Sequence, residues 1–175
     1  MGTRSRIAVM HGPVAKSVYC HWDGYLEHNG AILLEHYDSA KANQLVALGD
    51  LSSLGRVLGE KRPFSKFEIK DEDPEREAKL ALIEHAESEG WCNFYGRDRG
   101  ESDTEWEVAH TFEELVEQVE NDGSEWYYVM QDGTWYCGNT YENDVRFYKK
   151  LVLLAEALAQ ETVEEDAKTW QTVDL

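Results

Sequence analysis

Residues 18–25, with the sequence VYCHWDGY, bring a thiol, an imidazole, a carboxylate and three aromatic rings together within eight positions. Such a mixture could bind a metal, supply a cysteine nucleophile, or stack on a ligand and hydrogen-bond to it. On a strand, neighbouring side chains point to opposite faces, so Cys20 and His21 cannot hold one ion together. His21 and Asp23 share a face, and they are the pair on which a metal site would depend.

A metal site at His21 and Asp23 would need further ligands, which His28 and His36 could provide if the fold brought them close. These two histidines are eight residues apart, and the chain has no HExxH motif. A Cys20 nucleophile would need a distant histidine and an oxyanion hole, neither of which the sequence indicates. We therefore expect no metal, no cofactor and no catalytic residue. A metal-dependent hydrolase at His21 and Asp23 remains a third alternative.

The same segment is also typical of a strand that ends in a turn. In this interpretation Val18, Cys20 and Trp22 pack on one side, and Asp23-Gly24 forms the turn. In a separate alternative, side chains of this segment rim a shallow ligand pocket. Aromatic rings with polar groups beside them, and arginines that grip a phosphate or a carboxylate, are common in such pockets. The residues expected to bind a ligand in this alternative are His21, Trp22, Asp23, Tyr25, Arg97 and Arg99. Ordinary pairing of the two arginines with neighbouring acids is the simpler expectation.

Apolar periodicity and turn residues predict the elements that must position these side chains. Strands are expected over residues 4–10, 15–22, 91–96, 105–110, 126–130 and 135–138. Helices are expected over residues 30–37, 39–48, 73–90, 111–121 and 144–165. Residues 50–55 are expected to form a turn, residues 98–103 a polar loop, and residues 56–70 an irregular connector.

Strands that pair mostly as hairpins, with helices between them, indicate an α+β fold with a mainly antiparallel sheet and a long C-terminal helix. The chain of 175 residues is long enough for one domain with a packed core. We expect a single domain over residues 1–175, with 56–73 as the one plausible internal boundary and 166–175 as a loosely held tail.

The charge of the chain is unevenly distributed. The formal net charge is −18, yet residues 1–70 carry a small positive excess, so the acidity lies in residues 71–175. Residues 101–125 contain ten Asp and Glu and no Lys or Arg. Such a surface repels phosphates, which argues against direct binding of nucleic acid, and it attracts basic surfaces. The simple alternative is that the acidity keeps the protein soluble.

Other classes of protein receive little support from the sequence. The three cysteines have no CxxC spacing, which favours free thiols in a reducing cytoplasm. The N-terminal apolar run of residues 7–10 is too short for a signal peptide, and no stretch approaches a membrane span. Walker, GxGxxG, GxSxG, EF-hand and kinase motifs are missing, so nothing argues positively for an enzyme.

The opening MGTRSRIAV, followed by YCHWDGY, LLEHY and LGDLSSL, resembles a group of small accessory proteins encoded by tailed bacteriophages and prophages. The likeness is clearest over residues 1–55, and WCNFYGRDRGE and YYVMQDGTWYCG are weaker echoes of it. The resemblance implies an accessory protein made in the cytoplasm of an infected bacterium, where such proteins often bind and disable host machinery. It has no established chemistry to transfer, and the strongly acidic second part departs from a generic member.

Together these observations predict a non-enzymatic protein that binds a host defence or nucleic-acid-handling protein through an acidic, DNA-mimic-like surface. The partner would present a basic surface, and neither nucleic acid nor a membrane would be bound directly. The acidic residues expected to bind the partner are Glu101, Asp103, Glu105, Glu107, Glu113, Glu117, Glu120 and Asp122. The second alternative is a sponge for a nucleotide-like signal, which would use the aromatic strands with Arg97 and Arg99.

Overall fold

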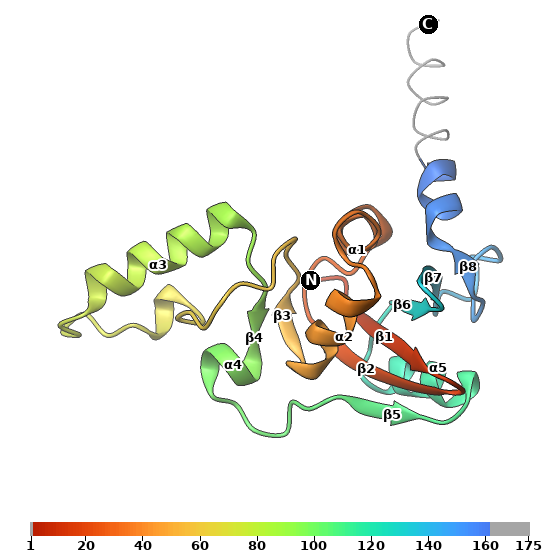
Figure 1. The fold of residues 1–175 in the computed structure, drawn as a ribbon, viewed down its shortest axis with the longest axis horizontal. Helices are drawn as coiled ribbons and strands as arrows, with labels where there is room; N and C mark the ends of the chain where they lie inside the picture. The colour runs from red at the N-terminus through yellow and green to blue at the C-terminus, as the bar shows by residue number, and fades with distance from the viewer. Residues whose placement is uncertain (1, 162–175) are drawn as a thin grey trace, which may run out of the picture.

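Two antiparallel hairpins joined side by side form the centre of the sheet. The computed structural model describes residues 2–161 of the chain. The first hairpin comprises β1 (Ser5–His11) and β2 (Val14–Cys20), and the second comprises β6 (Trp126–Gln131) and β7 (Thr134–Asn139). β1 and β6 pair in parallel, with Ser5 opposite Trp126. The centre of the sheet is therefore made by segments from opposite ends of the described chain (Figure 1).

Short strands extend the sheet on both sides. They are β3 (Leu51–Ser53), β4 (Asn93–Phe94), β5 (Glu107–Ala109) and β8 (Val152–Leu153). Within the described residues the strand order is β4-β3-β2-β1-β6-β7-β8, and β5 pairs with β2. Most pairs are antiparallel, the exceptions being β1 with β6 and β2 with β3. The predicted α+β class with a mainly antiparallel sheet is confirmed.

Helices cover both faces of the sheet. They are α1 (Ala31–His36), which follows a π-helical turn η1 (Leu26–Gly30), α2 (Ser39–Ala47), α3 (Arg76–Glu89), α4 (Tyr95–Arg99), α5 (Phe112–Asn121) and a helix that occupies residues 154–161. A 3₁₀ turn, η2 (Lys66–Glu68), lies in the connector before α3. Figure 1 shows α3 and this connector reaching away from the sheet, on the side of β4.

The alternation of side chains along the central strands creates two cores. Ile7 and Val9 of β1 pack with Leu33 of α1 and Leu45 of α2 on one face. Ala8 between them packs on the other face, against α5. A strand covered on both faces carries a continuous apolar run rather than an alternating one, which explains residues 7–10. α5, which carries Glu113, Glu117 and Glu120, packs on this second face.

The hairpin of β6 and β7 turns as its sequence predicts. Asp132 and Gly133 both have positive φ angles, 51° and 78°, as a type I′ turn requires. The capping box at the start of α5 is also present. The Thr111 side chain accepts a hydrogen bond from the Glu114 backbone N–H at 3.0 Å, and the Glu114 carboxylate accepts one from the His110 N–H at 2.9 Å.

The prediction that the C-terminal helix begins at residue 144 is wrong. Residues 144–150 form turns, β8 follows, and the helix begins at residue 154. Tertiary contacts override the helical pattern, because Phe147 is buried against the Trp126 ring, with 5.3 Å between ring centroids. The Tyr127 hydroxyl also donates a hydrogen bond to the Lys150 carbonyl at 2.5 Å. The predicted helix end at 165 and the predicted tail of residues 166–175 lie outside the described residues.

Three other boundaries differ from the prediction. Residues 50–55, expected to be a turn, contain β3, whose Leu51 is buried and pairs with Cys20. The strand expected over residues 91–96 is limited to β4 (Asn93–Phe94). The polar loop expected over residues 98–103 begins within α4 (Tyr95–Arg99). The buried Asp98 carboxylate explains α4, because it accepts a hydrogen bond from the Phe94 N–H at 2.7 Å and closes the first turn. α3 begins at Arg76 rather than near Asp73, and it ends at Gly90 as predicted.

Candidate functional site

The thiol of Cys20 lies in the core at the end of β2. The Asn29 amide donates to its Sγ at 3.4 Å, and burial raises the pKa of the thiol to about 12. A thiol with so high a pKa is protonated at neutral pH and is a poor nucleophile. The geometry thus gives no support to cysteine catalysis in this segment.

The histidines near this segment are held separately. His21 Nδ1 lies 2.7 Å from the Tyr19 hydroxyl, and burial together with the Arg4 charge lowers the His21 pKa. His28 contacts Asn29, and His36 lies 3.7 Å from Glu35. Among the described residues, no three His, Cys, Asp or Glu side chains are grouped so that they could hold a metal ion. The geometry gives no support to the metal-dependent hydrolase.

The turn after β2 presents an aromatic rim to solvent. Trp22 was expected to pack in the core, but 45% of its surface is exposed, and its ring contacts the His21 ring edge-on at 4.7 Å. β2 ends at Cys20, so strand alternation no longer governs Trp22. Asp23 adopts a positive φ of 55° at the turn, and Tyr25 is also exposed. These four side chains lie near one another along the chain, but they line none of the cavities described below.

Arg97 and Arg99, the other two residues of the ligand alternative, are engaged within the protein. The Arg97 guanidinium donates to the carbonyls of Leu58, Gly59 and Cys92 and to both Asp98 oxygens. Arg99 donates to Glu68 at 2.8 Å, and its guanidinium lies 4.3 Å from the centre of the Phe64 ring. Arg97 therefore links the connector to α4. Arg99 pairs with Glu68, which is the ordinary pairing with a neighbouring acid that the sequence led us to expect.

The eight acidic residues lie on the segment that runs from the end of α4 through β5 and α5. The chain leaves α4, runs along the sheet to β5, and then turns into α5 (Figure 1). α5 packs on the sheet through Leu115, Val116 and Val119. Its three predicted glutamates, Glu113, Glu117 and Glu120, are exposed, as their helical spacing predicts.

Half of these acids have cationic partners in the structure. Arg6 contacts Asp122 at 2.5 Å and Glu107 at 3.6 Å. Glu120 pairs with Lys149 at 3.1 Å, and Glu101 lies 3.7 Å from Arg99. The other four have no ion-pair partner within residues 2–161, and they are Asp103, Glu105, Glu113 and Glu117. We use the term acidic face for these four residues.

An exposed tryptophan lies beside the acidic face. Trp106 stands between Glu105 and Glu107, with 39% of its surface exposed, and the Lys16 ammonium lies 5.2 Å from its ring centre. Val108 of β5 is exposed as well. Tryptophan is enriched among the residues that dominate the affinity of protein interfaces.

The sequence prediction missed a buried charged cluster around Arg6 and Asp50. Only 2% of the surface of Arg6 is exposed, and its Nε donates to Ser17 Oγ at 2.7 Å. An arginine within an otherwise apolar strand was the signal available in the sequence. Asp50 lies nearby and accepts a hydrogen bond from the Tyr19 N–H at 2.9 Å. Nothing in the sequence around Asp50 marks it out.

We expect Asp50 to make stability depend on pH. Burial raises its pKa from the usual 3.8 to about 6, outweighing the Tyr19 N–H and the Arg6 charge. The folded protein therefore holds this proton more tightly than the unfolded chain, and stability falls as pH rises from about 4 to about 6. An Asp50→Asn variant removes this dependence, so its melting temperature relative to wild type should rise over that range. Parallel melting profiles of the two proteins would contradict the assignment.

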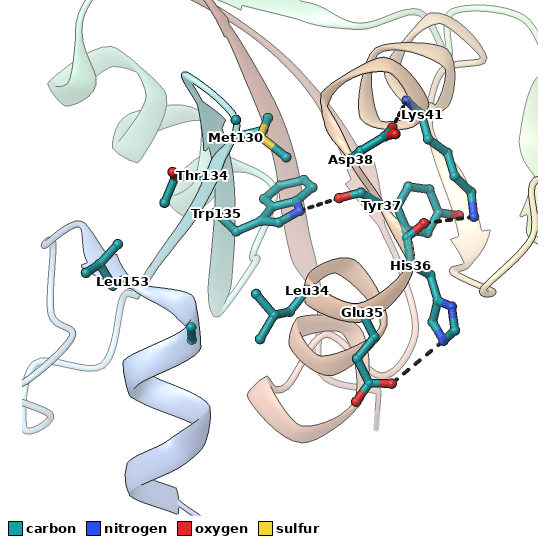
Figure 2. Close-up of a pocket in the computed structure, with 12 residues that line it drawn as sticks. Leu34, Glu35, His36, Tyr37, Asp38, Lys41, Met130, Thr134, Trp135 and Leu153 are labelled. Atoms are coloured by element: carbon teal, nitrogen blue, oxygen red, sulfur yellow. Dashed lines mark hydrogen bonds and ion pairs between the residues drawn. The ribbon is translucent and has the colours of Figure 1, made fainter.

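A cavity of about 590 Å³ lies between α1, α2, the β6–β7 hairpin and β8 (Figure 2). Two of its side-chain donors are already hydrogen-bonded within the protein. Trp135 Nε1 donates to the Tyr37 carbonyl at 2.9 Å, and Lys41 Nζ donates to the carbonyls of His36 and Arg56. Figure 2 shows the Trp135 indole pointing at the Tyr37 carbonyl and the Lys41 side chain reaching the His36 carbonyl. The cavity has the size of a ligand site but offers few free polar groups.

Comparison of the chain with protein-family models, with curated proteins and with solved structures finds no match. Over residues 2–161, no helix combines the length and the apolar character that crossing a membrane requires.

Proposed function

We propose that this protein acts by binding a partner protein through its acidic face, in the manner of a DNA mimic. The observation that carries the proposal is the set of four exposed carboxylates between residues 103 and 117 that have no cationic partner among residues 2–161. Uncompensated like charges repel one another and destabilise the folded state, and a basic partner would relieve that repulsion.

A groove that binds nucleic acid is lined by basic side chains, and the carboxylates of the acidic face could occupy it in place of phosphates. Glu113 and Glu117 are one helical turn apart, which is about 6 Å along and across the helix surface. Duplex DNA presents about one charge per 1.7 Å of axis, so α5 alone is too sparse. Asp103 and Glu105 add two exposed charges on the segment before β5. Trp106 supplies an apolar contact that phosphates lack, which would favour the mimic over DNA.

The setting proposed for this activity is the cytoplasm of a bacterium infected by a phage, as the resemblance of residues 1–55 implies. The three cysteines are consistent with a reducing compartment, since all are buried and unbridged. The partner would be a host defence or nucleic-acid-handling protein with a basic surface. This proposal assigns the protein a binding role and no catalytic one.

We expect neutralising the acidic face to weaken partner binding about tenfold. The variant combines Glu105→Gln, Glu113→Gln and Glu117→Gln. Each exposed ion pair is worth roughly 0.2–1 kcal/mol, so three lost pairs remove about 1.5 kcal/mol, or about a factor of ten. The measurement is quantitative affinity capture from a bacterial lysate by immobilised wild-type and variant protein, in about 0.1 M and about 0.5 M salt.

The matched control is the triple variant Glu72→Gln, Glu77→Gln and Glu89→Gln, which makes the same charge change at exposed positions on and beside α3. The proposal predicts that the control captures the partner as wild type does, and that duplex DNA displaces the captured protein. Capture that is equal for both triple variants, insensitive to salt or unaffected by DNA would refute the mimicry.

A further inference from the structure

Arg62 is buried in the connector without partners for most of its guanidinium. Only 7% of its surface is exposed. Its backbone N–H donates to Asp98 at 3.0 Å, and its Nε donates to the Pro63 carbonyl at 3.1 Å. Within residues 2–161, neither Nη nitrogen has a hydrogen-bond acceptor or an ion-pair partner. Burial lowers the Arg62 pKa, and the charges of Asp98 and Glu87 act in the opposite direction.

Two adjoining cavities meet at this arginine. One, of about 420 Å³, lies between the connector, α4 and the first half of α3. The other, of about 620 Å³, lies between the connector, β3 and the side of α3. Arg62, Phe64 and Ser65 line both cavities. We call the two together the connector cleft. Each of the two cavities has a volume in the range that small-molecule sites occupy, about 300–1,000 Å³.

The smaller cavity is suited to an anionic group. Three carboxylates line it, but each already has a cation: Glu68 pairs with Arg99 at 2.8 Å, Asp73 with Lys79 at 2.6 Å, and Asp98 with Arg97 at 2.9 Å. Two further cations, Lys61 and Arg62, line the same cavity. Arg62 thus offers uncompensated donors, and a phosphate or a carboxylate is the group that a guanidinium binds best.

The larger cavity is suited to a flat ring. Phe67 lines it with 88% of its surface exposed, held there by a 3₁₀ turn that the Ser65 hydroxyl caps at 3.2 Å. Trp91 lines the same cavity. Asn93 also lies there, and its buried Oδ1 accepts no hydrogen bond in the described part of the chain. Stacking on an aromatic ring and a hydrogen bond from a ring N–H would satisfy these groups.

We propose that the connector cleft binds a small planar anion of the nucleoside monophosphate class, with its phosphate on Arg62 and its base beside Phe67. Glu84 and Glu87 of α3 line only the larger cavity, so they direct the charged end of the ligand toward the smaller one. None of the four acidic-face residues lines the cleft, and of the two arginines expected from the sequence only Arg99 does, so Arg62 is the new anion-binding residue. A second binding activity would then reside in the part of the molecule that reaches away from the sheet.

The test is a thermal-shift screen followed by titration calorimetry with purine and pyrimidine nucleoside monophosphates, the matching nucleosides and inorganic phosphate. We expect at least one monophosphate at about 1 mM to raise the melting temperature, because a ligand that binds only the folded state stabilises it by mass action. The matching nucleoside should bind at least tenfold more weakly. The absence of a shift with every monophosphate would overturn the proposal.

Two variants separate binding from folding. Phe67→Ala changes an exposed ring, so it should leave the melting temperature of the free protein unchanged and weaken the monophosphate at least threefold. Arg62→Met should weaken it at least tenfold while leaving the free protein as stable as wild type or more so, because it removes a buried cation whose Nη donors have no partner within residues 2–161. The control is Arg76→Gln on α3, an arginine that lines neither cavity. Loss of stability in Arg62→Met with unchanged affinity would show that Arg62 is structural only.

Discussion

The substitution Arg6→Ala is expected to lower the free energy of unfolding by about 3 kcal/mol, because removing one partner of a buried ion pair typically costs about 3–5 kcal/mol. The guanidinium of Arg6 is buried and donates hydrogen bonds to Ser17 in β2 and to Asp122 at the end of α5. Its removal breaks the contact that links these two elements to β1. We place the value at the lower end because the carboxylates of Asp122 and Glu107 are partly exposed and water can hydrate them. The measurement is unfolding in urea monitored by circular dichroism.

A matched control for this experiment is Arg56→Ala, which removes an exposed arginine with one carbonyl contact to Ser88 at 3.4 Å. Its cost should stay within about 0.5 kcal/mol, as for most surface substitutions. Arg6→Lys keeps the charge but not the fork of donors, so an intermediate loss is expected. A loss below about 1 kcal/mol for Arg6→Ala would show that the pairs to β5 and α5 contribute little.

A second large loss, about 3 kcal/mol, is expected for Gly138→Ala in β7, at the upper end of the usual cost of overpacking. A Cβ at this position would overlap the Lys150 carbonyl oxygen and the Tyr127 hydroxyl. Those two groups are hydrogen-bonded to each other at 2.5 Å. The methyl group would push residues 144–150 away from the hairpin and expose Phe147, which is buried beneath them. Chemical denaturation and the near-ultraviolet signal of the aromatic rings would report both effects.

The comparison for Gly138→Ala is Gly133→Asn in the turn between β6 and β7. Gly133 has a φ of 78°, but nothing lies within 4 Å of a Cβ built there. Asparagine tolerates this conformation better than most residues, so a cost below about 1 kcal/mol is expected. Equal losses for the two variants would mean that backbone conformation, rather than the approach of Lys150, makes glycine necessary in β7.

The elements with strong local signals could be predicted from the sequence. The Asp132-Gly133 turn, the Thr111 cap and the Gly90 helix end each depend on chemistry within a few residues, and each is present. The order of these elements was enough to predict the α+β class. The parallel pairing of β1 with β6 was not predicted, because no local pattern specifies which distant strand completes a sheet.

Errors arose where distant residues decide the local conformation. Residues 144–150 have the apolar spacing of a helix, but the burial of Phe147 and the approach of Lys150 to Gly138 draw them into turns. Trp22 alternates with Cys20 in the sequence, but it lies beyond the end of β2 and faces solvent. In both cases the apolar pattern is present in the sequence, but tertiary contacts determine the local conformation.

The candidate sites were predictable only in part. The exposed positions of Glu113 and Glu117 follow from helical geometry, whereas the use of Asp122 and Glu107 by Arg6 depends on a strand more than a hundred residues earlier. Arg62 had no signal at all, since its burial results from the packing of the connector against α4. Pairing and burial of charges are properties of the fold, and they decide which charges remain available to a ligand.

The pairing of β1 with β6 also determines the order in which the chain can complete its fold. Residues 5–9 acquire their second neighbour only when residues 126–130 arrive. Closing a loop of that length costs about 4 kcal/mol of chain entropy beyond a constant, so this contact forms late and raises the contact order. During synthesis one edge of β1 therefore stays unpaired until nearly three-quarters of the chain has left the ribosome. The interval in which this strand can pair wrongly is set by topology, before any partner or ligand is present.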